Sequence, residues 1–98
     1  MAIPNKIEAL LGFAQKSGKI IFGTDNILFY KTDKFLILCD QNLADNAQKK
    51  LRRYAEERKI PVKISQQPLS VLLHKEGVKA VAVTDPNLAA EILKITDI

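Results

Sequence analysis

Hydrophobic positions follow two different spacings along the chain. Near the N-terminus apolar residues stand three and four positions apart, which predicts a helix capped by Asn5 and ended by Ser17 and Gly18. Residues 35–39 are instead continuously apolar, as in a strand that is covered on both faces of a sheet. The two patterns alternate to the C-terminus, which indicates an α/β protein.

Turn and capping residues divide this pattern into the order α-β-α-β-α-β-α-β-α. Strands are expected at 19–22, 35–39, 60–65 and 78–84, and the later helices from Asp25 to about Lys31, after Asn42, from Gln66, and from Pro86 behind the cap Asp85. The run 35–39 belongs at the centre of the sheet, whereas Pro61 places its strand nearer an edge. Short connections favour a three-layer α/β/α sandwich around a mostly four-stranded mixed sheet.

Composition supports one globular domain over residues 1–98. Hydrophobic residues make up 47% of the 98 residues and charged residues 27%, and this length suffices for one core but not for two. The N-terminus lacks the apolar centre of a signal peptide, and no apolar run reaches the ~20 residues of a membrane helix. We therefore expect a cytoplasmic protein without a membrane partner. The net charge of +4 is compatible with a polyanionic partner.

Most enzyme classes lack their usual residues in this sequence. His74 is the single histidine and Cys39 the single cysteine, so one chain cannot assemble a Cys/His metal site, and Cys39 is expected to be buried and inert. In one enzyme hypothesis Asp40 and Asp85, which both follow apolar strands, hold a metal for hydrolysis. Each aspartate also precedes a helix that it can cap. We expect no enzymatic activity, no cofactor and no bound metal.

A short apolar strand runs into a glycine and then a helix start within the first third of the chain. Thr24 is expected to cap this helix, and Asp25 to place a carboxylate beside its free N–H groups. A ligand here would also meet Asn26, with Lys19 and Lys31 nearby, a set that suits a phosphate backbone and a few base edges. The same residues are also ordinary helix-start chemistry, and no Gly-rich nucleotide-binding loop is present.

A dense basic cluster lies on the long helix that follows residue 42. It comprises Lys49, Lys50, Arg52 and Arg53, followed by Glu56 and Glu57. Amphipathic helices commonly carry such charges, so a solvated face with partial salt bridging to the two glutamates is the simplest interpretation.

Four runs together resemble the kink-turn-binding ribosomal protein superfamily. They are 11–19 (Leu-Gly-Phe-Ala-Gln-Lys-Ser-Gly-Lys), 23–26 (Gly-Thr-Asp-Asn), 35–40 (Phe-Leu-Ile-Leu-Cys-Asp) and 80–85 (Ala-Val-Ala-Val-Thr-Asp). The chain is most similar to the small bacterial YlxQ-like members, over nearly its whole length. The resemblance implies an α/β/α sandwich, a ribosomal or ribosome-associated role and structured, kink-turn-like RNA as partner, recognised through its backbone and exposed base edges.

The resemblance also implies two contact segments. In the family a glycine and the following helix start approach the sheared G·A pairs of the kinked RNA, and a later loop covers a flipped-out nucleotide. With the two lysines near the first segment, the expected RNA-binding residues are Lys19, Gly23, Thr24, Asp25, Asn26, Lys31, Glu76, Gly77 and Val78.

The chain departs from the family pattern at several of these positions. The family commonly has Asn or Lys in place of Asp25, Glu or Gln in place of Asn26, and Lys in place of Phe29, and its Leu-Gly-x-Ala-x-Gly run reads here as Leu-Ser-Val-Leu-Leu-His at 69–74. Asp25 adds repulsion toward phosphates and Phe29 removes a cation. An alternative hypothesis is a protein-binding module of the same fold that uses Phe22, Phe29 and Tyr30 as an apolar patch.

Overall fold

The structure is a computed structural model that describes residues 6–95, and the helices and strands follow the predicted order. The outcome of the Asn5 cap lies outside these residues. The elements are α1 (Lys6–Lys16), β1 (Ile20–Phe22), α2 (Thr24–Phe29), β2 (Leu36–Asp40), α3 (Asp45–Arg58), β3 (Val62–Ser65), α4 (Leu69–Leu72), β4 (Ala80–Val83) and α5 (Pro86–Leu93).

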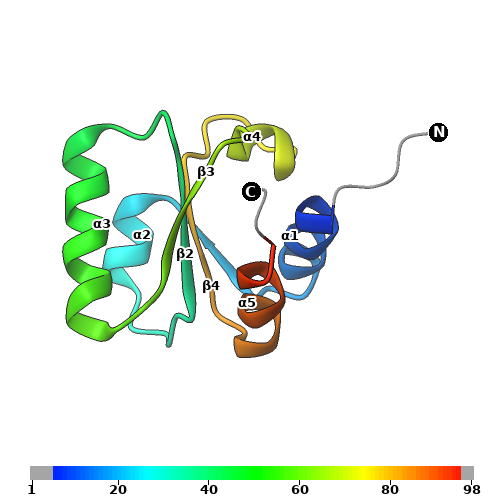
Figure 1. Cartoon of the computed structure of the whole chain (residues 1–98), viewed down its shortest axis with the longest axis horizontal. Helices are drawn as coiled ribbons and strands as arrows, with labels where there is room; N and C mark the ends of the chain where they lie inside the picture. Colours follow the sequence, from blue (N-terminus) through cyan, green and yellow to red (C-terminus); the bar gives the residue numbers. More distant parts are fainter. Residues whose placement is uncertain (1–5, 96–98) are drawn as a thin grey trace.

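The strands form one mixed sheet of four strands in the order β1-β4-β2-β3. β4 pairs antiparallel with both β1 and β2, and β2 pairs parallel with β3. As predicted, the apolar strand β2 is internal and the proline-led strand β3 lies at an edge. Because β1, β2 and β3 all run opposite to β4, they all end where β4 begins. We call this edge of the sheet the Gly23 edge; it is the upper edge in Figure 1.

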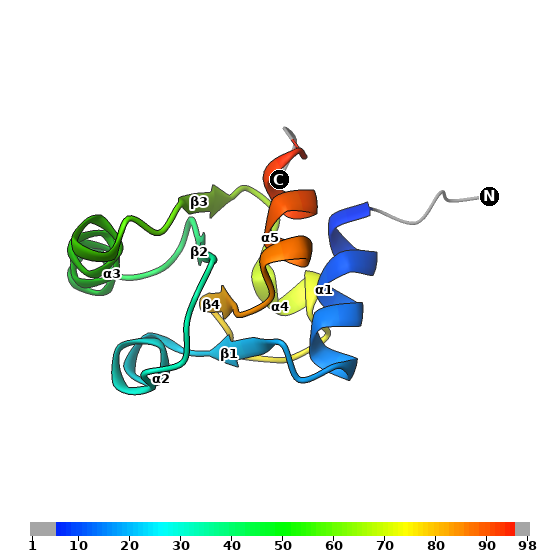
Figure 2. The ribbon, with the colours of Figure 1, turned by 90° about the horizontal axis from the view of Figure 1, so that it is seen from below.

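Helices cover both faces of the sheet, which confirms the three-layer α/β/α sandwich. α2 and α3 lie on one face, and α1, α4 and α5 lie on the other (Figures 1 and 2). Alternation along β2 divides the core accordingly: Leu36 and Leu38 pack toward α1 and α5, whereas Ile37 and Cys39 pack toward α2 and α3. Among residues 6–95, no helix combines the length and the apolar character needed to cross a membrane.

Local hydrogen bonds explain where the element boundaries differ from those predicted. Asp40 accepts the backbone N–H of Asn42 at 2.8 Å and so holds a turn after β2. The long helix therefore begins only at Asp45, behind Ala44. Thr24 does not cap α2, because Gly23 occupies the cap position and no side-chain cap bond forms there. The predicted start of α5 is confirmed, since Asp85 accepts the N–H groups of Asn87 and Leu88.

Candidate functional site

The end of β1 brings the two segments predicted to contact RNA together. Gly23 has φ of 90°, a conformation that side chains disfavour and glycine allows, and the chain turns there directly from β1 into α2. Its N–H donates to the carbonyl of Ala80 at 2.8 Å. This bond places residues 23–26 beside the loop that leads into β4. We call the segments 23–26 and 75–79 together the corner.

Polar groups of α2 face solvent at the corner. Asp25 and Asn26 are exposed, and the Asn26 side-chain amide donates to the carbonyl of Phe22 at 2.9 Å. In the described part of the chain, no hydrogen bond to the Asn26 side-chain oxygen is formed. Within residues 6–95 no hydrogen bond or ion pair engages the Asp25 carboxylate. The helix has only six residues, so side chains rather than a helix dipole carry the chemistry of this surface.

The loop before β4 supplies the other half of the corner. Glu76 is exposed, and Gly77 turns the chain with φ of 78°. Val78 is 8% exposed and belongs to the core. Its side chain therefore anchors the loop and is not available to cover a flipped-out nucleotide, the role that the resemblance implied. Two cations that were not predicted flank these residues: Lys75, whose Nζ lies 4.2 Å from the ring centroid of Phe22, and Lys79, which is exposed. Lys75 and Lys79 directly flank residues 76–78 in the sequence, and this adjacency was the signal that could have predicted them.

Two predicted lysines lie away from the corner. The carbonyl of Lys19 accepts the N–H of Thr84 at 2.9 Å, which fixes Lys19 at the opposite end of β1. Lys19 and Gly23 are four positions apart along an extended chain, which separates them by about 13 Å. Lys31 follows the C-terminal end of α2 and is likewise removed from Gly23. The corner therefore carries two cations and the two carboxylates of Asp25 and Glu76, and its formal charge is balanced.

The two aspartates of the enzyme hypothesis lie at opposite edges of the sheet. Asp40 ends β2 and Asp85 follows β4, and these strands are antiparallel, so their carboxyl ends point in opposite directions. Each carboxylate is also engaged by backbone N–H groups. In the part of the chain that the structure describes, no group of three or more His, Cys, Asp or Glu residues is placed to hold a metal. A shared metal site of Asp40 and Asp85 is therefore wrong.

Cys39 is fully buried in the core, as predicted. Desolvation by burial raises its pKa from 9.0 to about 11, and the positive charge of Arg52 opposes this rise. The thiol is therefore protonated at neutral pH and is not a nucleophile.

The three aromatic residues of the protein-binding hypothesis do not form one patch. Phe22 is partly buried and packs against the core beneath α1, on the sheet face opposite α2. Phe29 and Tyr30 are instead 77% and 49% exposed at the C-terminal end of α2. Only these two rings are available together.

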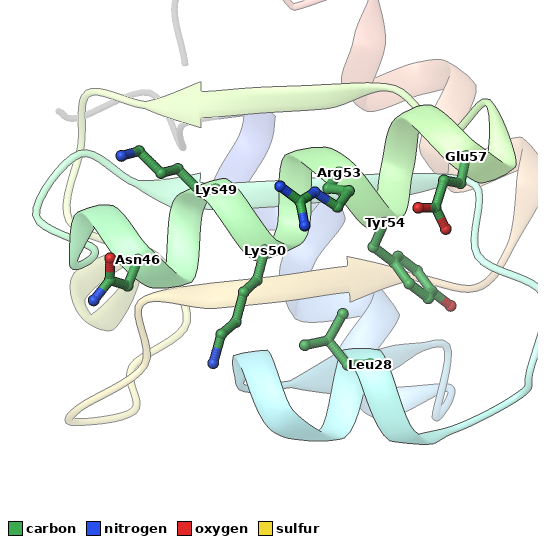
Figure 3. Close-up of a pocket in the computed structure, with 7 residues that line it drawn as sticks. All are labelled: Leu28, Asn46, Lys49, Lys50, Arg53, Tyr54 and Glu57. Atoms are coloured by element: carbon green, nitrogen blue, oxygen red, sulfur yellow. The ribbon is translucent and has the colours of Figure 1, made fainter.

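A basic groove runs between α2 and α3, which pack against each other. It has a volume of about 470 Å³ and is lined by Leu28, Asn46, Lys49, Lys50, Arg53, Tyr54 and Glu57 (Figure 3). We call it the α2–α3 groove. The predicted basic cluster thus divides, with Lys49, Lys50 and Arg53 at the groove and Arg52 in a separate hollow toward β3.

No protein-family model matches the chain, and no curated protein matches its sequence. Among solved structures, a protein of unknown function from Bacillus halodurans C is similar with a TM-score of 0.85, over 93% of this chain and 96% of that chain. The two sequences are 19% identical. The similarity therefore shows a shared α/β/α fold and carries no functional assignment.

Proposed function

We propose that this protein binds structured RNA through the corner, without catalysis, as a ribosomal or ribosome-associated protein of the kink-turn-binding type. One observation carries the proposal: the Gly23 N–H to Ala80 carbonyl bond holds the first segment that the family resemblance assigns to RNA beside the end of the loop that contains the second. In the sequence, 49 positions separate residue 26 from residue 75, and the fold brings the two segments together at one end of the sheet.

The chemistry of the corner suits recognition of distorted RNA. Thr24 and Asn26 offer short polar side chains for exposed base edges, and Lys75 and Lys79 offer cations for the adjacent phosphates. The corner carries no net charge, so its contribution is selectivity for shape and base edges rather than general attraction to polyanions. Attraction comes from the net charge of +4 over the whole chain.

The test compares a kink-turn RNA with a straight duplex of equal length, by titration at several salt concentrations. We expect the kink-turn to bind more tightly, with log–log salt slopes of roughly −0.7 to −0.9 per phosphate contact. Asn26→Ala should weaken binding to the kink-turn, and Asn87→Ala, an exposed asparagine on α5, serves as the matched control. Equal binding of both RNAs by the wild type would contradict kink-turn recognition.

A second candidate is a protein-binding module, and exposed Phe29 and Tyr30 are the observation that favours it. Their rings pack edge to face, with centroids 5.5 Å apart. Exposed adjacent aromatic rings serve protein interfaces as well as nucleic-acid surfaces. A flat salt response with no RNA bound at low salt would favour this candidate.

A further inference from the structure

The α2–α3 groove carries cations that form no ion pair with any acidic residue in the described part of the chain. Lys49, Lys50 and Arg53 are exposed, and none of them takes part in an ion pair within residues 6–95. Glu57, which ends the groove, pairs with its neighbour Arg58 at 3.9 Å. The salt bridging expected along this helix is therefore missing among the three cations that line the groove, and all three face solvent.

The groove continues into a second hollow at its far end. Leu28 and Tyr54 line both spaces, and Figure 3 shows these two side chains meeting between the helices. The second hollow, of about 560 Å³, is also bordered by Phe29, Tyr30 and Arg58. The Phe29 ring is 77% exposed, an unusual state for a phenylalanine on a free surface. A space lined by cations thus continues into one bordered by exposed aromatic rings.

A buried cation fixes the geometry of this aromatic end. The ammonium of Lys34, which is 7% exposed, donates to the carbonyls of Tyr30 and Thr32 and to the hydroxyl of Tyr54. It ties the segment that carries the exposed rings to α3. The rings and the cations of α3 are therefore held in a defined relation before any ligand binds, which lowers the entropic cost of binding.

We propose that the α2–α3 groove binds a single-stranded RNA segment, with phosphates on Lys49, Lys50 and Arg53 and an unpaired base stacked on Phe29. From Asn46 to Glu57 the helix rises about 16 Å, which matches about five stacked nucleotides. Cationic grooves that lead to aromatic platforms are the common design of single-strand binding surfaces. A duplex keeps its bases paired and stacked, so it offers no free base to the rings.

The groove also adjoins the corner. β1 and β2 run in the same direction, so α2 and α3 both begin at the Gly23 edge. A strand that leaves structured RNA at the corner enters the groove at Asn46 and passes toward Phe29. This placement rests on the RNA binding proposed above, whereas the groove's own affinity for a single strand does not.

The experiment measures binding of a fluorescent, unstructured 12-nucleotide RNA, here about twice the length the groove holds. Lys49→Gln, Lys50→Gln and Arg53→Gln are combined in one variant. The control variant combines Lys16→Gln, Arg52→Gln and Lys94→Gln, which removes the same charge from exposed positions outside the groove. We expect the groove variant to lose at least about ten-fold in affinity and to lower the salt slope by about 2, from three contacts at about 0.7 each.

The stacking step has its own matched pair. Phe29→Ala should weaken binding by about five-fold or more. Phe13→Ala removes another exposed phenylalanine, 61% exposed on α1, and should leave binding unchanged. Since all these side chains are exposed, each variant is expected to keep the fold. Measuring the thermal unfolding midpoint of each variant checks this expectation.

Three results would overturn the groove assignment. They are equal losses in the groove and control triple variants, an unchanged affinity in Phe29→Ala, and competition by a polyglutamate peptide as strong as that by the unlabelled RNA. The two proposals fail separately. If the wild type binds the 12-nucleotide RNA through the groove but does not prefer a kink-turn, the corner proposal alone fails, whereas a kink-turn preference with no groove effect refutes only the groove.

Discussion

Asp40 links β2 to α4 through a buried carboxylate, and its replacement by asparagine should destabilise the fold. The side chain is 3% exposed. One carboxylate oxygen accepts the N–H of Asn42 at 2.8 Å, and the other accepts the N–H of Leu69 at 2.9 Å. Asp40→Asn keeps one acceptor and turns an amide N–H₂ toward the remaining backbone donor.

The cost follows from this geometry. A hydrogen bond to a charged acceptor contributes about 1.5–3 kcal/mol, so the loss of one should lower the free energy of unfolding by about 2 kcal/mol. With a urea dependence of about 1–2 kcal/mol/M, the unfolding midpoint should fall by about 1–2 M. Urea titration followed by circular dichroism measures this shift. RNA affinity of the folded protein should change little, because Asp40 is buried and structural.

A matched control is Asp33→Asn, which removes the same charge from an exposed loop position. It should change the free energy of unfolding by less than about 0.5 kcal/mol. If Asp40→Asn unfolds at the same urea concentration as Asp33→Asn, the two hydrogen bonds of Asp40 do not stabilise the fold. Full stability combined with lost RNA binding would instead give Asp40 a direct role in binding.

Three further predictions concern other residues. Burial raises the pKa of Cys39 to about 11, so the thiol stays protonated in the folded chain while the unfolded chain ionises. Wild-type stability relative to Cys39→Ala should therefore fall by about 2 kcal/mol as the pH rises from 9 to 11, measured by urea titration. Lys34→Met should cost about 1.5–3 kcal/mol through the loss of three hydrogen bonds from a buried ammonium, and should increase amide exchange in residues 30–34. Asp25→Asn should tighten kink-turn binding by about 1 kcal/mol with no equal gain on a duplex.

The order of elements was predictable because each element carries its own signal. The continuous apolar run at 35–39 indicated an internal strand, and Asp85 followed by Pro86 indicated a helix start, and both are confirmed. Residues 23–26 and 76–78 were placed in one site only through the family resemblance. Strand pairing, which the sequence pattern does not encode, brings them together.

Distances across elements were not predictable from spacing along the chain. Lys19 stands four residues from Gly23, yet a strand carries it to the opposite end of the sheet, about 13 Å away. Asp40 and Asp85 both follow strands, but the antiparallel pairing of β2 and β4 places them at opposite edges. The α2–α3 groove lies between two helices that are separated by 16 positions in the chain, from Phe29 to Asp45. Both helices begin at the Gly23 edge, and only the assembled fold shows that they lie side by side.

The most direct test of RNA recognition at the corner is nuclear magnetic resonance mapping of the labelled protein during titration with kink-turn RNA. We predict that the backbone amide signals of residues 23–26 and 75–79 shift or broaden first, and that signals of α1 and α5 on the other face of the sheet stay in place. A straight duplex of equal length should leave the corner signals unchanged. Shifts confined to α1 and α5, or no shifts at all, would contradict RNA recognition at this corner.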